Sequence, residues 1–137
     1  MRGNLIQTFH VNPFADTASL RYIDLTDNQI RSWKKPLLHS SPNMERLVMT
    51  NNHISTVTEA MLKDVAPLVE VSLLSNPLDC DCQLLPIKTH VVANETKLSI
   101  KVDLCSSPDE WRFSPVTKFL THLNHRCQKV LFSVTLP

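Results

Sequence analysis

Residues 20–30 read LRYIDLTDNQI, and the spacing of their apolar and asparagine positions returns twice along the chain. The framework L-x-x-I-x-L-x-x-N-x-I recurs, with conservative apolar exchanges, at residues 44–54 and 68–78. Each copy begins 24 residues after the previous one, and the recurring asparagines are Asn28, Asn52 and Asn76. Six framework positions at one fixed period predict a repeat architecture in which each unit stacks on its neighbour.

The repeat unit has a physical interpretation. Ile23 and Leu25 alternate with polar residues, which predicts a short strand with one side buried. We expect the chain to turn directly after this strand, over residues 26–28. An asparagine side chain has two donors and one acceptor for main-chain groups that the turn leaves unpaired. The spacing therefore predicts an asparagine ladder, which includes an earlier position in the same register: Asn4, Asn28, Asn52 and Asn76.

Large apolar residues also recur between the predicted strands. We expect them to fill the outer half of the core. Two positions of the repeat carry them: Phe9, Trp33 and Val57 at one, and Phe14, Leu38 and Leu62 at the other.

The framework resembles the leucine-rich repeat. This resemblance implies an α/β solenoid in which leucine-rich repeat coils of 24 residues carry a parallel inner sheet. Residues 1–79 would be repeats, the first partial and the next three at 20–43, 44–67 and from 68 to 79 onward. The register places Met1 in the middle of a repeat, and the first twenty residues lack the apolar run of a signal peptide. We therefore expect a fragment of a longer repeat protein.

All four cysteines follow the last repeat, at Cys80, Cys82, Cys105 and Cys127. Four cysteines allow three disulfide pairings, and a zinc site is the rival interpretation of the cluster. The stretch 76–84, NPLDCDCQL, resembles the C-terminal cysteine-rich cap of extracellular leucine-rich repeat proteins. That resemblance implies a cap over residues 80–127 that closes the solenoid with the disulfides Cys80–Cys105 and Cys82–Cys127, and a tail over 128–137. Paired cysteines would place the chain in an oxidising compartment.

Three further expectations concern the cap. Asn94-Glu95-Thr96 is a glycosylation sequon, so Asn94 is a candidate glycan site. Because proline suits a first helical turn, Pro86 predicts a short helix that begins near Leu85. We expect this helix to seal the core with Leu84, Ile87, Val91 and Val92. Family members usually carry an aromatic residue in this helix, and we expect Trp111 and Phe113 to supply it here.

Composition excludes several classes of function. The formal net charge of +1 gives no electrostatic footprint for nucleic acid, and no stretch approaches the length of a membrane span. No nucleophile elbow, phosphate loop or zinc-protease signature is present, so we expect neither an enzyme nor a bound cofactor or metal. His90, His122 and His125 are interpreted as surface histidines of the cap.

The register also predicts which side chains line the inner sheet. Solenoids usually bind partners on this surface, because its side chains form aligned rows. The candidate surface comprises Tyr22, Asp24, Arg46, Val48, Glu70, Ser72 and Leu74. Tyrosine and arginine are enriched in binding hot spots, which makes Tyr22 beside Arg46 the candidate contact centre. The alternative is that these are ordinary solvated positions and that Arg46 pairs with Glu70 across the strands.

The family resemblance implies an extracellular protein–protein recognition module with a protein ligand or co-receptor as partner. The repeats and cap look most like the membrane-proximal end of a Toll-like or adhesion receptor ectodomain, which serves innate immunity or cell adhesion, or a secreted fragment of one. Two alternatives remain open, a secreted matrix or adhesion protein and an intracellular repeat scaffold. A homodimer through exposed ends of the solenoid is a further expectation.

Overall fold

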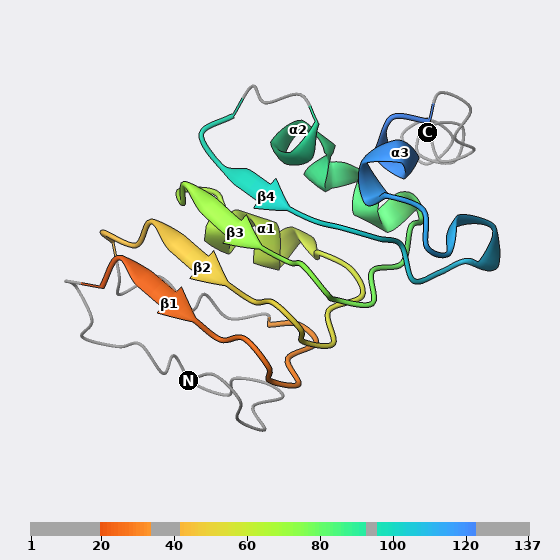
Figure 1. Ribbon diagram of the computed structural model, residues 1–137. Helices are drawn as coiled ribbons and strands as arrows, with labels where there is room; N and C mark the ends of the chain where they lie inside the picture. The colour runs from red at the N-terminus through yellow and green to blue at the C-terminus, as the bar shows by residue number, and fades with distance from the viewer. Residues whose placement is uncertain (1–19, 34–41, 93–95, 123–137) are drawn as a thin grey trace, which may run out of the picture.

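The computed structural model describes residues 20–33, 42–92 and 96–122 of the 137-residue chain. Its centre is a sheet of four parallel strands in the order β1-β2-β3-β4, which is also their order along the chain (Figure 1). Each strand has three residues: β1 (Tyr22–Asp24), β2 (Arg46–Val48), β3 (Glu70–Ser72) and β4 (Ser99–Lys101).

The strands form where apolar residues alternate with polar ones. The middle residue of each strand is buried, and these four apolar side chains lie in register across the sheet. They are Ile23, Leu47, Val71 and Ile100. The pairing of Tyr22 with Arg46, and of Arg46 with Glu70, reproduces the spacing found in the sequence. Successive side chains of a strand point to opposite sides of the sheet. The buried middle residues therefore lie on one side, and the first and third residues of each strand lie on the other, open side.

A tight turn follows each of the first three strands. Asp27, Asn51 and Ser75 adopt the left-handed conformation there, with φ of 61°, 56° and 58°. Asparagine and aspartate tolerate this region better than most residues, whereas serine does so less readily. The chain has a single glycine, so these residues take the role that glycine has in many turns.

The asparagine that follows each turn is buried. The amide nitrogen of Asn52 donates to the carbonyl oxygens of Leu25 and Met49, both at 3.0 Å. Its side-chain oxygen accepts from the amide of Ile30 at 3.1 Å. One side chain thus bonds to its own coil and to the preceding one. Asn28 and Asn76 are likewise buried and bonded, whereas Asn4 lies outside the described residues.

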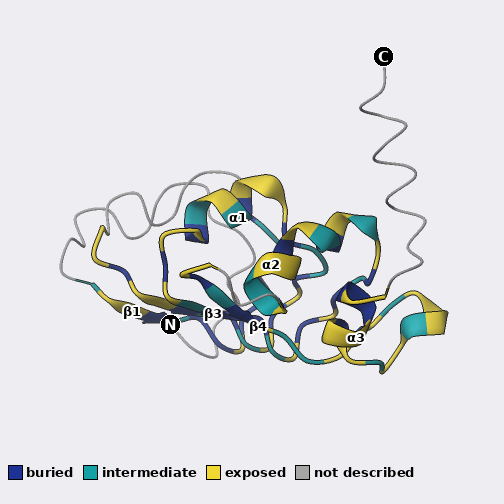
Figure 2. Cartoon of the chain, turned by 90° about the horizontal axis from the view of Figure 1, so that it is seen from above, coloured by how far each residue is buried: buried dark blue, intermediate teal, exposed yellow. Residues whose placement is uncertain are grey.

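The helices lie on the side of the sheet opposite to the open side. Helix α1 (Glu59–Val65) begins after Thr58, whose side chain accepts from the amide of Met61 at 3.2 Å. Figure 2 shows α1 and α2 (Lys88–Val91) in a layer on one side of the strands. The outer apolar positions Trp33 and Val57 are buried and Leu62 is partly buried. The other members of this set, Phe9, Phe14 and Leu38, lie outside the described residues.

A group of short helices completes the C-terminal side of the described chain. The 3₁₀ helix η1 (Cys82–Ile87) leads into α2, and the 3₁₀ helix η2 (Asp109–Trp111) precedes α3 (Val116–Leu120). The core here is formed by Leu84, Ile87, Leu98, Val116, Phe119 and Leu120. Within the described ranges, no helix combines the length and apolar character that a membrane crossing requires.

Two expectations for this region are wrong. The helical segment begins at Cys82 instead of near Leu85, because the Asp81 side chain caps it by accepting from the amide of Gln83 at 3.0 Å. Pro86 then falls inside 3₁₀ geometry, ahead of the α-helical turn. Val92 was expected in the core but is exposed, since α2 ends at Val91 before reaching it.

The aromatic residues differ from expectation in a similar way. Trp111 is half-buried and packs against the core, as expected, but Phe113 is 71% exposed. The aromatic residue buried in this C-terminal part of the core is Phe119 of α3, whose ring meets that of Trp111 edge to face at 5.2 Å. The apolar spacing of Val116, Phe119 and Leu120 fits one face of a helix and could have identified it.

Candidate protein-interaction surface

The outward-facing side chains of the four strands form two rows across the sheet, and we call this surface the open face. The first row follows the register of the leading residues of each strand: Tyr22, Arg46, Glu70 and Ser99. The second row follows the third residues: Asp24, Val48, Ser72 and Lys101. Figure 1 shows the four strands side by side in the order β1-β2-β3-β4 that both rows follow. The hydrogen-bonding register of the sheet therefore brings most of the predicted surface residues together.

The first row contains Tyr22 and Arg46, whose residue types are enriched in binding hot spots. Tyr22 is 55% exposed, and Arg46 beside it is also exposed. Arg46 forms no ion pair with any described residue. The expected cross-strand partner, Glu70, instead meets Lys101 diagonally, with 3.7 Å between Nζ and Oε1. Tyr22 and Arg46 are thus neighbours in the register of the sheet, and both are exposed on the open face.

The second row is less accessible than predicted. Ser72 is buried and its hydroxyl lies 3.1 Å from that of Thr50, so its assignment to the contact surface is wrong. The cause is its interior position, flanked in the row by Val48 and Lys101. Asp24, Val48 and Leu74 are half-buried.

Lys101 is an exposed member of the open face that the sequence analysis missed. It lies in β4, outside the 24-residue framework. Leu98 and Ile100 are buried and alternate with Ser99 and Lys101, and this period-2 pattern was the available signal.

A disulfide anchors the segment that follows β3. Cys80 and Cys105 are both buried and bonded to one another, with 5.7 Å between their Cα atoms. This is the pairing that the family resemblance implied, and it removes two of the four thiolates that a zinc site would need. Cys82 is disulfide-bonded as well. Its expected partner, Cys127, lies outside the described residues, as does the sequon residue Asn94.

The two cap histidines that the structure describes, His90 and His122, have different neighbours. The Nδ1 atom of His90 lies 2.8 Å from the Thr96 hydroxyl, while the His122 ring lies 5.2 Å from that of Trp111. His125 lies outside the described residues. Among the residues that the structure does describe, no three histidine, cysteine, aspartate or glutamate side chains form a group that could hold a metal ion.

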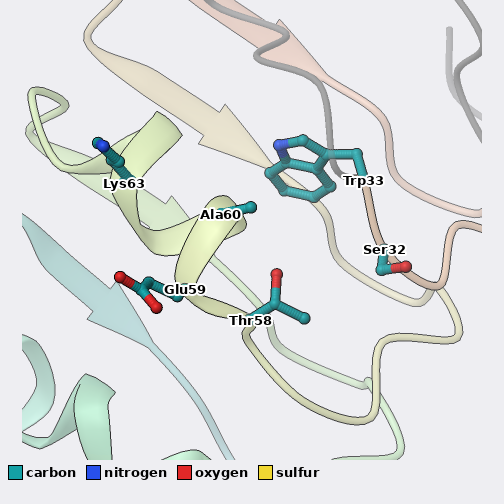
Figure 3. Close-up of a pocket in the computed structure, with 6 residues that line it drawn as sticks. All are labelled: Ser32, Trp33, Thr58, Glu59, Ala60 and Lys63. Atoms are coloured by element: carbon teal, nitrogen blue, oxygen red, sulfur yellow. The ribbon is translucent and has the colours of Figure 1, made fainter.

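The side opposite the open face is hollowed around the first turn of α1. Figure 3 shows one hollow, where the Trp33 indole stands beside Ala60 and Lys63 lies further along the helix. The Trp33 Nε1 donates to the Asp64 carboxylate at 2.8 Å. A second hollow lies between α1 and η1, and Thr58 and Glu59 line both.

Comparison with known proteins identifies the fold. The chain matches no protein-family model. Over 67 residues it is 28% identical to the platelet glycoprotein Ib beta chain of Rattus norvegicus, a match that covers 49% of this chain and 32% of that protein. The crystal structure of human 5T4 (Wnt-activated inhibitory factor 1, trophoblast glycoprotein) aligns with a TM-score of 0.67 at 22% identity, covering 85% of this chain and 43% of that one.

A second solved structure is similar. It is the octameric complex of latrophilin 3, Unc5D and FLRT2, with a TM-score of 0.57 at 23% identity over 71% of this chain and 30% of the matched one. These neighbours are leucine-rich repeat proteins, and with the parallel sheet they confirm the leucine-rich repeat fold. The chain spans less than half the length of each of these three matched chains. None of their names denotes an enzyme.

Proposed function

We propose that this chain is an extracellular protein-recognition module that binds a protein partner through the open face of its sheet. The observation that carries the proposal is the row in which Tyr22, 55% exposed, stands beside Arg46, which has no ion pair among the described residues. Tyrosine and arginine supply a large share of binding energy where they anchor interfaces. Lys101 and Glu70 form a polar border on the β4 side.

The cysteines support the extracellular part of the proposal. The Cys80–Cys105 disulfide and the bonded Cys82 fit an oxidising compartment. An intracellular repeat scaffold would keep these thiols reduced, so the disulfide counts against that alternative. The sequon Asn94-Glu95-Thr96 makes Asn94 a candidate glycan site in such an oxidising compartment.

The finer assignment rests on the family resemblance. We infer that residues 1–79 are repeats of a solenoid and that residues 80–127 are its C-terminal cap, with Cys82 joined to Cys127. The chain would then be the C-terminal part of a receptor ectodomain of the Toll-like or adhesion kind, or a secreted fragment of one. The FLRT2 structure is an assembly with two other proteins, which supports a protein partner. A secreted matrix protein is the second candidate, because it would share fold, disulfides and compartment.

Binding to a panel of purified extracellular domains tests the proposal, using the whole chain secreted from eukaryotic cells with an added leader. We expect Tyr22→Ala and Arg46→Glu each to weaken binding to the captured domain at least about tenfold, the loss typical of an interface hot spot. Lys63→Ala, on α1 at the other side of the sheet, is the matched control and should change nothing. Equal affinity in all three variants would reject the open face.

A non-reducing peptide map of the same protein tests the compartment. We expect linked peptides Cys80–Cys105 and Cys82–Cys127, and a glycan on Asn94. Four free thiols with a bare Asn94 would make the intracellular scaffold the better interpretation.

A further inference from the structure

Phe113 combines two unfavourable features at one position. Its ring is 71% exposed, and its main chain is left-handed with φ of 67°. A bulky residue at positive φ is an outlier, because its Cβ crowds the neighbouring carbonyl. Residues held in such conformations cluster at binding and other functional positions. The conformation and exposure of Phe113 therefore make it a candidate for a role in binding.

The position is also held rigidly. The Phe113 amide donates to the Cys105 carbonyl at 2.9 Å, and the Cys105 amide donates to the Ser114 carbonyl at 2.8 Å. Cys105 is itself fixed by its disulfide to Cys80. The Arg112 guanidinium carbon lies 5.1 Å from the centroid of the Phe113 ring. An exposed ring that is ordered before contact loses little conformational entropy on binding.

A complementary hollow lies on another part of the molecule. It has a volume of about 540 Å³ between α1 and η1, and we call it the outer groove. Its lining residues are Thr56, Val57, Thr58, Glu59, Leu62, Gln83 and Pro86. Its volume falls in the range of about 300–1,000 Å³ that small-molecule pockets occupy, enough for a phenyl ring. Glu59 is the one charged side chain in this lining, and it is exposed.

We propose that the Phe113 ring of one copy of this chain inserts into the outer groove of a second copy, with Arg112 against Glu59. The ring supplies the apolar body for the groove, and the two charges have opposite sign. Of the flanking charges, Lys63, one turn along α1 from Glu59, is opposite in sign to Asp109 and Glu110, which precede the ring, whereas Asp81 at the start of η1 has the same sign as they do. The same acidic pair disfavours insertion of Phe113 into an anionic membrane surface.

The contact between Phe113 and the outer groove is separate from the two interaction surfaces described so far. It uses neither the open face nor the ends of the repeat array, through which the sequence predicts a homodimer. Ring and groove are different surfaces, so copies joined by this contact form a reciprocal pair, a closed ring or an open chain. An interface centred on one aromatic side chain is small, and small interfaces are weak. Association should therefore emerge only at high protein concentration.

Sedimentation velocity on the intact disulfide-bonded chain tests the proposal, over about 5–500 μM, a range that brackets weak association. We expect the sedimentation coefficient to rise with concentration. Phe113→Gly should lower the association constant at least about tenfold, as for a hot-spot residue. Glycine adopts positive φ without steric cost, so this variant should fold. A chain that stays monomeric throughout the range would overturn the proposal.

A charge exchange tests the orientation of the contact. Arg112→Glu and Glu59→Arg should each weaken association, and the double variant should restore it. Arg46→Glu, on the open face, should leave self-association unchanged. This variant therefore separates self-association through Phe113 from partner binding through the open face, and each proposal can fail without the other. Absence of restoration would overturn the pairing. Flotation of a monomeric wild-type chain with phosphatidylcholine–phosphatidylserine vesicles, lost in Phe113→Gly, would replace it with a membrane contact.

Discussion

The side-chain carbonyl of Asn76 accepts a hydrogen bond from the main-chain amide of Asn52 at 3.1 Å, and so joins one coil of the chain to the next. The same oxygen accepts from the amide of Ile54, also at 3.1 Å, while the amide nitrogen donates to the Met49 carbonyl at 2.9 Å. Strands of only three residues leave many main-chain groups outside the sheet. Buried asparagines satisfy those groups where water does not reach them.

Asn52→Ala should therefore lower the free energy of unfolding by about 1–3 kcal/mol, the cost of leaving buried polar groups unpaired. The amide of Ile30 is left without a partner, because its hydrogen bond goes to the Asn52 side chain. The carbonyls of Leu25 and Met49 each lose one donor and keep a second, from the side chains of Asn28 and Asn76. Urea denaturation followed by circular dichroism measures the change. The control is His53→Ala at the exposed neighbouring position, which should stay within about 0.5 kcal/mol of the parent. Equal stability of the two variants would contradict the role of the ladder.

The disulfide offers a second prediction. Cys80 and Cys105 are 25 residues apart, and a loop of that length stabilises the fold by about 3–4 kcal/mol in the chain-entropy model. Replacing both cysteines by serine should lower the free energy of unfolding by that amount. Replacing both together avoids a free thiol that could exchange with the bond of Cys82. A measured loss below about 1 kcal/mol would contradict this prediction. It would mean that the unfolded chain without the disulfide already keeps residues 80 and 105 close together.

The ion pair between Glu70 and Lys101 should contribute little to stability. Its atoms are 3.7 Å apart and the side chains are 31% and 55% exposed, so water screens the attraction. Lys101→Met should change the free energy of unfolding by less than about 1 kcal/mol at both low and high salt. A salt-dependent loss well above this limit would mean that the open face is stabilised by charge.

The repeats were predictable because the same local pattern of apolar residues and asparagine occurs three times in the sequence. Ile23, Leu47 and Val71 point inward for the same reason, and each following asparagine completes the same turn. Beyond Asn76 the pattern stops. Glu70 pairs with Ser99, and the number of residues between these partners differs from the 24 that separate the partners in the earlier strands. The repeat pattern therefore did not predict β4 or the exposure of Lys101. The open face was thus predicted on its repeat side and not on its C-terminal side.

The C-terminal helices show a different limit. The family resemblance implied the Cys80–Cys105 pairing, but the position of each side chain depends on contacts between segments distant in sequence. Trp111 packs against the core while Phe113, two residues later, turns outward. The decisive feature is the left-handed main chain at Phe113, and residue type alone argues against that conformation.

Two phenylalanines near one another in sequence provide the last prediction. Phe119 is 2% exposed and packs on Trp111, so Phe119→Ala should lower the free energy of unfolding by about 3–5 kcal/mol. Phe113→Gly loses only an exposed cation–π contact with Arg112, which contributes about 0.5–1 kcal/mol. It also relieves the positive φ, which costs about 1–3 kcal/mol for a residue other than glycine. The relief of strain equals or exceeds the lost contact, so the free energy of unfolding should stay unchanged or rise by up to about 2.5 kcal/mol.

Thermal and urea unfolding of the two variants beside the parent chain measure this contrast. Phe113→Ala is the matched control: it removes the same ring contact but keeps a Cβ at positive φ, so its stability should fall below that of Phe113→Gly. A marked destabilisation by Phe113→Gly would mean that the ring supports the fold, and the outward position would then need no binding role. Unchanged or raised stability leaves the exposed ring without a folding purpose, which is the condition that an anchor for a second molecule requires.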